Sequence, residues 1–329
     1  MIKNILLGFL LIFFSSCKHA PEPEAIPDWY TSPPVDYDYF YVVGIGNDKE
    51  DAQNNALTNF RISLAETLDV AIRRQNHPLG YLDENVLNVL SKSNEEIANT
   101  ILISDVKIEE SVSFNFKTLL LLKISRQDIF KNADLASASK IATSKERYEK
   151  LSKLPDLEKY TQLKILISNF AGLSTYTQLK EICVPKFDAS KDFEILKDIY
   201  ESLLELRSSF TFYILSDANS IGFVNFIKEG ISKESLALHS KLRDENSYKI
   251  LITSKSESSI DYSFMQSKTV LKAELYDSKG LLLAKKQHTF IGKSRDSHKD
   301  AKEQAAQNLR AKISKLGFFD FIGLKTTQR

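Results

Sequence analysis

Apolar residues recur at helical spacing near both ends of the chain, in two stripes that repeat every three or four residues. Residues with this period share one face of a helix, and that face has to be buried. The pattern therefore predicts two amphipathic helices, the first capped by Asn47 with Glu50 three residues on. The two stripes are Ala52, Ala56, Phe60, Leu64 and Leu68, and Ala301, Ala305, Leu309, Ile313 and Leu316.

Runs of aromatic and β-branched residues predict strands. One run covers residues 39–43 and ends at Gly44-Ile45-Gly46, which reads as a tight turn. Polar and apolar residues alternate within 101–116, and a further apolar run covers 119–124. In the last third, residues 277–280 read Asp-Ser-Lys-Gly and predict a hairpin turn. The strands expected there are 210–215, 248–253, 269–276 and 281–291.

Helical spacing without a strand signal continues from about residue 133 to 206. Shorter helices are expected at 84–98, 221–227 and 234–242. The chain is thus predicted to be an α+β protein, with two small domains of mixed helix and sheet joined by a helical middle segment. The expected ranges are 37–132 for the first α+β domain, 133–207 for the helical segment, 208–318 for the second α+β domain and 319–329 for a tail.

The two ends of the chain resemble each other in pattern. Near the N-terminus, a strand is followed by Gly44 and by the stripe that starts at Ala52. Near the C-terminus, a strand is followed in the same order by Gly292 and by the stripe that starts at Ala301. Small residues at the start of each stripe let a helix lie close to a sheet. Either an internal repeat or ordinary helix-on-sheet packing explains the match.

The first sixteen residues have the pattern of a signal peptide, with Lys3 before an apolar run of ten residues, 5–14. As a helix this run is about 15 Å long, half of the roughly 30 Å that a bilayer core requires. Phe14-Ser15-Ser16-Cys17 follows and resembles a bacterial lipobox, in which the cysteine thiol is acylated and becomes the first mature residue. Cys17 is therefore the expected lipidation site, which attaches the protein to the membrane.

Residues 17–36 are expected to form an extended tether, because five of the eight prolines lie between residues 18 and 34. Lys18 follows Cys17, where an Asp retains many lipoproteins in the inner membrane. By that resemblance the chain is expected at the outer membrane, lipid-anchored and facing the periplasm. The 44 Lys and Arg residues against 43 Asp and Glu provide no attraction for nucleic acid, which is not expected as a partner.

Motifs for catalysis are incomplete. A dinucleotide fingerprint at Gly44-Ile45-Gly46 requires glycine at position 49, which is Lys49, and a phosphate loop at Gly292-Lys293-Ser294 requires one at Gln287. Ser137 and Lys140 have the spacing of a Ser-x-x-Lys pair without its supporting motifs. No enzymatic activity, cofactor or metal is expected. Cys183 is expected in a core. The acidic pairs Glu95-Glu96 and Glu109-Glu110 form no recognisable catalytic motif, and neither do the scattered histidines His19, His77, His239, His288 and His298.

Several short motifs between residues 27 and 131 resemble the Lpp-twenty family of outer-membrane lipoproteins. They are Pro27-Asp28-Trp29, the strand Tyr41-Val42-Val43-Gly44-Ile45-Gly46 and the helix that carries Ala52, Ala56 and Arg61. Members of that family have a Pro-x-Trp motif, a Tyr-Val-Gly-x-Gly strand and an alanine-rich helix after an acyl anchor.

Residues 210–316 resemble, more loosely, the envelope domain shared by TolB N-terminal regions, the penicillin-binding-protein activator LpoB and the secretion lipoprotein CsgG. The shared order is a strand, a long hairpin, Gly292-Lys293-Ser294 and an alanine-bearing helix. These resemblances imply a non-enzymatic outer-membrane lipoprotein that binds other envelope proteins or itself, in a structural or assembly role. The alternative is a periplasmic module that activates an envelope enzyme such as a cell-wall synthase.

Overall fold

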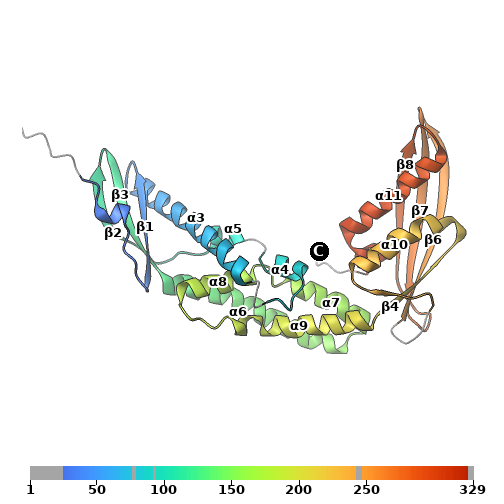
Figure 1. Ribbon diagram of the computed structural model, residues 1–329, viewed down its shortest axis with the longest axis horizontal. Helices are drawn as coiled ribbons and strands as arrows, with labels where there is room; N and C mark the ends of the chain where they lie inside the picture. The colour runs from blue at the N-terminus through green and yellow to red at the C-terminus, as the bar shows by residue number, and fades with distance from the viewer. Residues whose placement is uncertain (1–24, 76–78, 92–93, 242–246, 325–329) are drawn as a thin grey trace, which may run out of the picture. The chain divides into compact units, whose positions relative to one another are not determined.

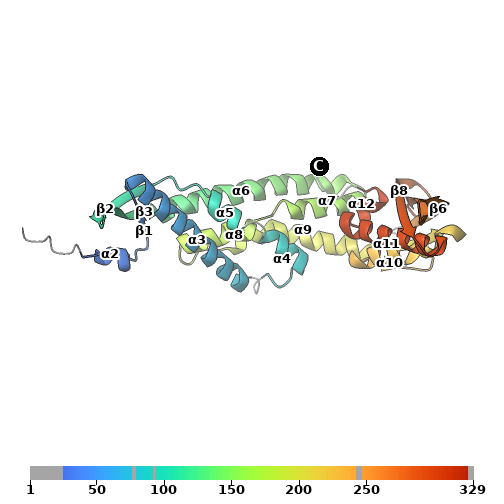
Figure 2. The same cartoon turned by 90° about the horizontal axis from the view of Figure 1, so that it is seen from above.

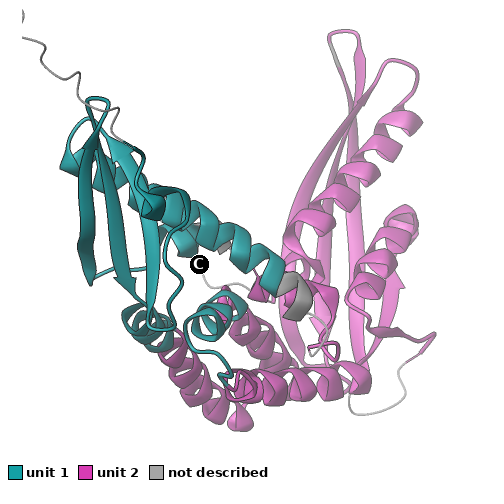
Figure 3. Ribbon diagram, turned by 60° about the vertical axis from the view of Figure 1, so that its left-hand side comes forward, with its two compact units in different colours: residues 1–77, 93–136, 174–187 teal, residues 78–92, 137–173, 188–329 magenta. Residues whose placement is uncertain are grey.

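The computed structural model describes residues 25–75, 79–91, 94–241 and 247–324 (Figure 1). Helices and two separate sheets make up these residues, which confirms the α+β class. The chain divides into two compact units (Figure 3). Unit 1 contains residues 1–77, 93–136 and 174–187, and unit 2 contains residues 78–92, 137–173 and 188–329.

Unit 1 is built on a three-stranded antiparallel sheet with the order β1-β3-β2. Helix α3 packs on one face of this sheet. On that face Leu120 and Leu122 are buried with Ala52 and Ala56 of α3. The elements are α2 (Asp28–Thr31), β1 (Tyr39–Gly46), α3 (Lys49–Gln75), α5 (Asn94–Thr100), β2 (Val106–Phe114), β3 (Lys117–Ser125), the first half of α6 (Arg126–Lys150) and most of α8 (Leu173–Cys183).

The opposite face of the unit 1 sheet is also covered. Leu119 and Leu121 alternate with the residues that face α3, so their side chains point away from it. Both are nevertheless buried. The short helix α2 contacts β3 and carries the half-buried Trp29 and Tyr30. Part of the expected tether, 17–36, is therefore folded onto this sheet.

Unit 2 has a five-stranded sheet with the order β5-β4-β6-β7-β8. Strand β4 runs parallel to β5 and β6, and the other pairs are antiparallel. Helix α11 packs on β7 and β8 and contacts α10 (Figure 1). The elements are α4 (Glu84–Leu90), the end of α6, η1 (Leu151–Lys153), α7 (Asp156–Ser168), α9 (Ser190–Ser209), β4 (Thr211–Ser216), η2 (Ala218–Ser220), α10 (Ile221–Lys233), β5 (Ala237–Leu238), β6 (Ser247–Asp261), β7 (Phe264–Tyr276), β8 (Leu282–Ser294), α11 (His298–Leu316) and α12 (Phe318–Ile322).

In each sheet, glycine occurs where a helix backbone lies against an edge strand. A Cβ atom on Gly44 of β1 would lie 2.1 Å from the Ala52 carbonyl oxygen of α3. A Cβ atom on Gly292 of β8 would lie 1.9 Å from the Ala301 carbonyl oxygen of α11. Both positions therefore need glycine for the close approach of strand and helix. The matching patterns at the two ends of the sequence correspond to this shared contact.

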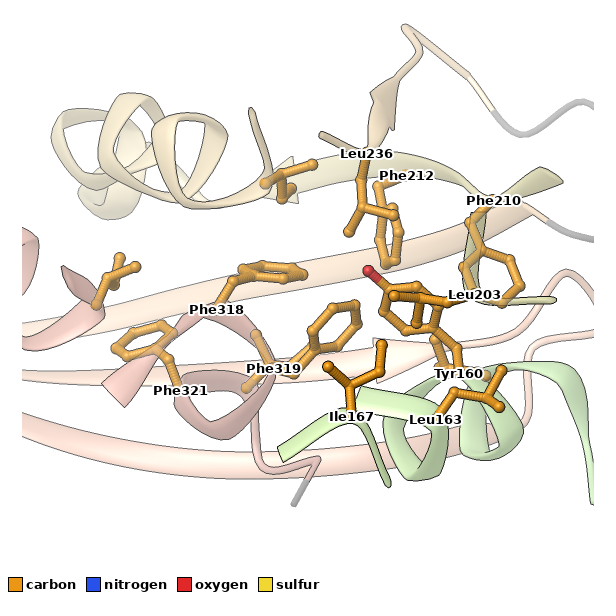
Figure 4. Close-up of a cluster of buried hydrophobic side chains, with 14 of the residues drawn as sticks. Tyr160, Leu163, Ile167, Leu203, Phe210, Phe212, Leu236, Phe318, Phe319 and Phe321 are labelled. Atoms are coloured by element: carbon orange, nitrogen blue, oxygen red, sulfur yellow. The ribbon is translucent and has the colours of Figure 1, made fainter. Parts of the chain in front are cut away.

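An aromatic cluster joins the helices of unit 2 to its sheet (Figure 4). The ring of Tyr160 on α7 packs against Phe210, with centroids 5.4 Å apart, and against Phe319 of α12 at 5.3 Å. Phe212 of β4 contacts Phe318 of α12 edge to face at 5.8 Å. Helices α7 and α9 run side by side next to this cluster (Figure 2). One hydrophobic core thus includes α7, α9, β4 and α12.

The expected domain limits differ from this arrangement in two respects. Residues 133–207 are mostly helical as predicted, but they are divided between the two units, since α6 starts in unit 1 and ends in unit 2. The tail predicted for 319–329 is wrong at its start, because Phe319, Phe321 and Ile322 of α12 are fully buried. Aromatic burial fixes a segment that is too short to show a helical period.

Several local expectations also need correction. Helix α10 ends at Lys233, and Ser235 has a φ of 57°, so the helix predicted for 234–242 is wrong over its described part, 234–241, which contains a turn followed by β5. The single helix predicted for 84–98 is wrong, because two helices, α4 and α5, lie between Glu84 and Thr100. The N-terminus of α3 is capped by Asp48, whose carboxylate accepts the Asp51 N–H at 2.9 Å, and not by Asn47. Strand β6 continues to Asp261, well beyond the predicted end at residue 253.

The Gly292→Ala variant tests the close strand–helix contact of unit 2. The added methyl group has to displace α11 backbone, so we expect the variant to lose about 1–3 kcal/mol of stability. Gly222→Ala in α10 is the matched control, because a Cβ atom there meets no atom within 4 Å. Thermal unfolding compares them, and an unchanged melting temperature for Gly292→Ala would contradict the contact.

The Phe319→Ala variant tests the aromatic cluster. Removal of this buried ring leaves a cavity between α7, β4 and α12, and we expect a loss of about 3–5 kcal/mol. Phe116→Ala removes a ring that is fully exposed at the β2–β3 turn and should change stability by less than about 0.5 kcal/mol. Chemical denaturation of both variants measures the difference, and equal effects would show that the cluster contributes little.

Candidate functional site

The predicted lipidation site, Cys17, lies outside the described residues, so it stays a prediction from the sequence. The nearest described residues, from Ala25 through α2, belong to unit 1. None of the helices in the described ranges is both long and apolar enough to cross a membrane.

The two glycine motifs have a structural explanation. The tight turn predicted at Gly44-Ile45-Gly46 is wrong, because these residues continue β1 and pair with β3. A Cβ atom on Gly46 would lie 2.2 Å from the Ala52 amide nitrogen, so the backbone of α3 occupies the space next to this motif. At Gly292-Lys293-Ser294, the Lys293 N–H donates to Gln304 Oε1 of α11 at 2.6 Å. The space next to each motif is therefore filled by a helix of the same unit.

His288 of β8 is buried, with 4% of its surface exposed. Its ring stacks on Phe321 with centroids 4.3 Å apart, and Nε2 donates to the Phe321 carbonyl oxygen at 2.7 Å. Burial lowers the pKa of His288, and the nearby Lys312 and Lys286 lower it further. The neutral imidazole therefore attaches α12 to the sheet and does not face solvent as a general base would.

Cys183 is buried in the core of unit 1, as expected. Burial raises the pKa of its thiol to about 12, so the thiolate needed for nucleophilic chemistry is scarce near neutral pH. It borders a cavity of about 490 Å³ that Tyr39 and Arg126 also line. The Arg126 guanidinium is held by the Ile182 carbonyl oxygen at 2.8 Å and lies over the Phe40 ring.

The other residues considered from the sequence do not converge. Ser137 is buried inside α6, and Lys140 Nζ reaches the Asn169 carbonyl oxygen at 3.5 Å. Glu109 lies 3.8 Å from Lys123 of the neighbouring strand β3. It occupies a β-bulge between Ile108 and Glu110, whereas Glu110 pairs regularly with β3. Across the described ranges, no three His, Cys, Asp or Glu residues are close enough to hold a metal ion.

One cavity of unit 2, about 570 Å³, is lined by both polar and apolar residues. Asp156 and Glu158 of α7 line it together with Tyr248 and with Asp277 and Lys279 of the β7–β8 turn. Burial raises the pKa of Tyr248 to about 12, and the two aspartates add to the increase. This phenol therefore stays protonated at neutral pH and is not a base there.

A second cavity of unit 2, about 480 Å³, is lined by charges that are already paired. Lys164 forms an ion pair with Glu234, and Lys233 lies 3.5 Å from Glu229. Asp83 accepts a hydrogen bond from the Tyr200 hydroxyl at 3.2 Å and lies 3.9 Å from Arg207. These pairs connect α4, α7, α9 and α10, which is a structural role.

Two outer sheet edges are partly covered by side chains of their own unit. On β1 the Ile45 N–H donates to Asn55 of α3 at 3.1 Å, and Arg126 donates to the Tyr39 carbonyl oxygen at 3.3 Å. On β8 the Ile291 carbonyl oxygen accepts from Asn308 of α11 at 2.8 Å. Such bonds reduce the number of backbone groups available to another strand.

Strand β6 has a longer open edge. Its neighbour β4 pairs only with residues Ser247 to Ile252. Asp217 then bonds the next two backbone groups on this edge of β6. Its N–H donates to the Ile252 carbonyl oxygen, and its carboxylate accepts the Ser254 N–H at 3.3 Å. From Lys255 onward no described segment pairs with this edge. Sequence reasoning missed it, although a signal exists: there is no apolar residue between Ile252 and Ile260.

Comparison with known proteins gives no family. Neither the models of protein families nor the curated proteins include a match to this chain.

Three solved structures show limited similarity. The secreted protein HP1454 from Helicobacter pylori matches with 12% identity over 87% of this chain and 99% of its own, with a TM-score of 0.39. A minor lipoprotein from Acinetobacter baumannii matches with 8% identity over 33% of this chain and 91% of its own, with a TM-score of 0.29. Lipoprotein GNA1162 from Neisseria meningitidis matches with 15% identity over 32% of this chain and 99% of its own, with a TM-score of 0.24.

The buried His288 predicts a pH dependence of stability. Its pKa is lower in the folded state than the value of about 6.5 in an unfolded chain, so the unfolded state binds more protons as the pH falls below about 6.5. The stabilisation is present above that pH and is lost as the pH falls through the folded-state pKa. We expect the His288→Gln variant to lose less melting temperature than the wild type between about pH 7.5 and about pH 5.5. If the variant and the wild type lost the same melting temperature, the pH dependence of stability would come from groups other than His288.

Proposed function

We propose that this chain is a lipoprotein of the bacterial cell envelope, acylated at Cys17 and held at the periplasmic side of the outer membrane. The observation that carries the proposal is the sequence Phe14-Ser15-Ser16-Cys17 after an apolar run too short to span a bilayer. A diacylated or triacylated terminus gives stable membrane attachment, whereas a single chain is marginal. Lys18 supports the outer membrane over the inner one.

The proposed role is non-catalytic binding of other envelope proteins, in a structural or assembly function. It is supported by the use of the reactive side chains in packing: His288 bonds to α12, Cys183 is a protonated core thiol, and Lys164 is paired with Glu234. The motifs between residues 27 and 131 support placement near the Lpp-twenty family. Open strand edges provide a physical means of binding a partner.

A second proposal is a regulatory module that activates one envelope enzyme. The observation that favours it is the looser resemblance of residues 210–316 to activator and secretion domains. Crosslinking in intact cells, followed by detergent extraction and mass spectrometry, separates the two roles. A structural role predicts crosslinks to several envelope components or to further copies, and a regulatory role predicts one enzyme at a fixed stoichiometry.

The Cys17→Ala variant tests the anchor. Because the variant lacks the thiol that is acylated, we expect it to incorporate no labelled palmitate and to leave the membrane fraction, while the wild type is labelled and sediments with membranes. Cys183→Ala is the matched control, since its thiol is buried and should be irrelevant to acylation. Labelling of the Cys17→Ala variant would contradict the anchor.

A further inference from the structure

The open part of the β6 edge extends from Lys255 to Asp261, opposite the side where β7 pairs with it. Ile252 and Ser254 use their carbonyl and N–H groups on the β4 side, toward Asp217. Backbone groups alternate in direction along a strand, so those of Ser256, Ser258 and Ile260 also point to this side. The side chains of residues 255–260 are all exposed.

This edge lacks two of the features that usually protect an exposed strand, a proline and a bulge, although it carries the charged Lys255 and Glu257. Residues 253–261 contain no proline, and β6 pairs with β7 without a bulge throughout this stretch. By contrast, on β8 the outer Lys293 N–H and Ile291 carbonyl oxygen are bonded by Gln304 and Asn308 of α11. The distal part of β6 is therefore better suited than the β8 edge to accept another strand.

We propose that two copies of this chain associate through antiparallel pairing of their β6 edges, centred on Ser258. In this register Ser258 faces Ser258 of the second copy, Ser256 faces Ile260, and Glu257 faces Ser259. A two-fold axis through Ser258 makes the contact self-complementary and joins the two five-stranded sheets into one.

The order of charges selects this register. A centre at Ser258 places Lys255 opposite Asp261 twice, which pairs residues of opposite charge. A centre at Glu257 places that glutamate opposite itself, and a centre at Ser259 places Glu257 opposite Asp261. Both alternatives bring like charges together, which is destabilising between directly opposed residues.

The length of the open edge also favours the register centred on Ser258. Pairing centred on Ser258 uses residues 255–261 of both copies, the whole stretch beyond the groups that Asp217 occupies. A centre at Ser256 would require the second copy to pair with Ile252, whose carbonyl oxygen already accepts the Asp217 N–H at 3.2 Å. A second copy of the chain therefore fits both the length and the charge order of this edge.

Thiol crosslinking of the full-length chain in its native membranes tests the proposal. The Ser258→Cys variant places two thiols next to the two-fold axis, so a short bis-thiol reagent should give a covalent dimer in several-fold higher yield than the wild type. The wild type measures any background from Cys17 and Cys183. Thr289→Cys is the matched control, because Thr289 is exposed on the outer edge of β8.

A second variant tests whether backbone pairing is responsible. Ser256→Pro removes an N–H that points away from β7, so it should abolish the Ser258→Cys dimer, whereas Gln287→Pro on β8 should not. No excess dimer over the wild type, equal dimer from Thr289→Cys, or a dimer that survives Ser256→Pro would each overturn the proposal. The inference deepens the binding role proposed above, but neither variant alters Cys17, so this test can fail while the lipid anchor holds.

Discussion

The aromatic contacts among α7, β4 and α12 are the interaction on which the larger unit depends. Tyr160, Phe212 and Phe319 come from segments far apart in the sequence, and their rings meet in one buried cluster (Figure 4). Without it, the helices of the middle segment and the C-terminal sheet would each expose a large apolar face. The cluster therefore makes one folded body out of segments that the sequence presents as separate domains, and this body holds the strands whose edges remain open.

The sequence predicted the elements with a strong period and missed those fixed by long-range contacts. The stripe from Ala52 is the buried face of α3, and the stripe from Ala301 is buried as far as Ile313, whereas Leu316 is exposed. Residues Asp277 to Gly280 form the turn between β7 and β8. Helix α12 was missed because five residues cannot show a helical repeat. The distal half of β6 was missed because its residues are polar on both faces, and only pairing with β7 makes it a strand.

The two sheets solve the same packing problem with the same residue types. In each, an edge-strand glycine faces two alanines of the following helix, and an amide side chain from that helix bonds the next backbone N–H, Asn55 at Ile45 and Gln304 at Lys293. Close approach of a helix to a strand requires small residues whatever the ancestry, so this packing is sufficient to explain the sequence match, and an internal repeat explains it equally well. The lipidation predicted at Cys17 rests on local sequence, whereas the open edge of β6 depends on where β4 ends.

Native-state hydrogen exchange of the full-length chain tests most directly whether the middle helices and the C-terminal sheet form one cooperative body. The account predicts that the slowest amides of α7 and α9 open with the same free energy as those of β6 and β7 within unit 2, because all of them lose protection when the aromatic cluster separates. Exchange from α7 and α9 at a much lower free energy than from the sheet would contradict it, since the helices would then open as an independent domain.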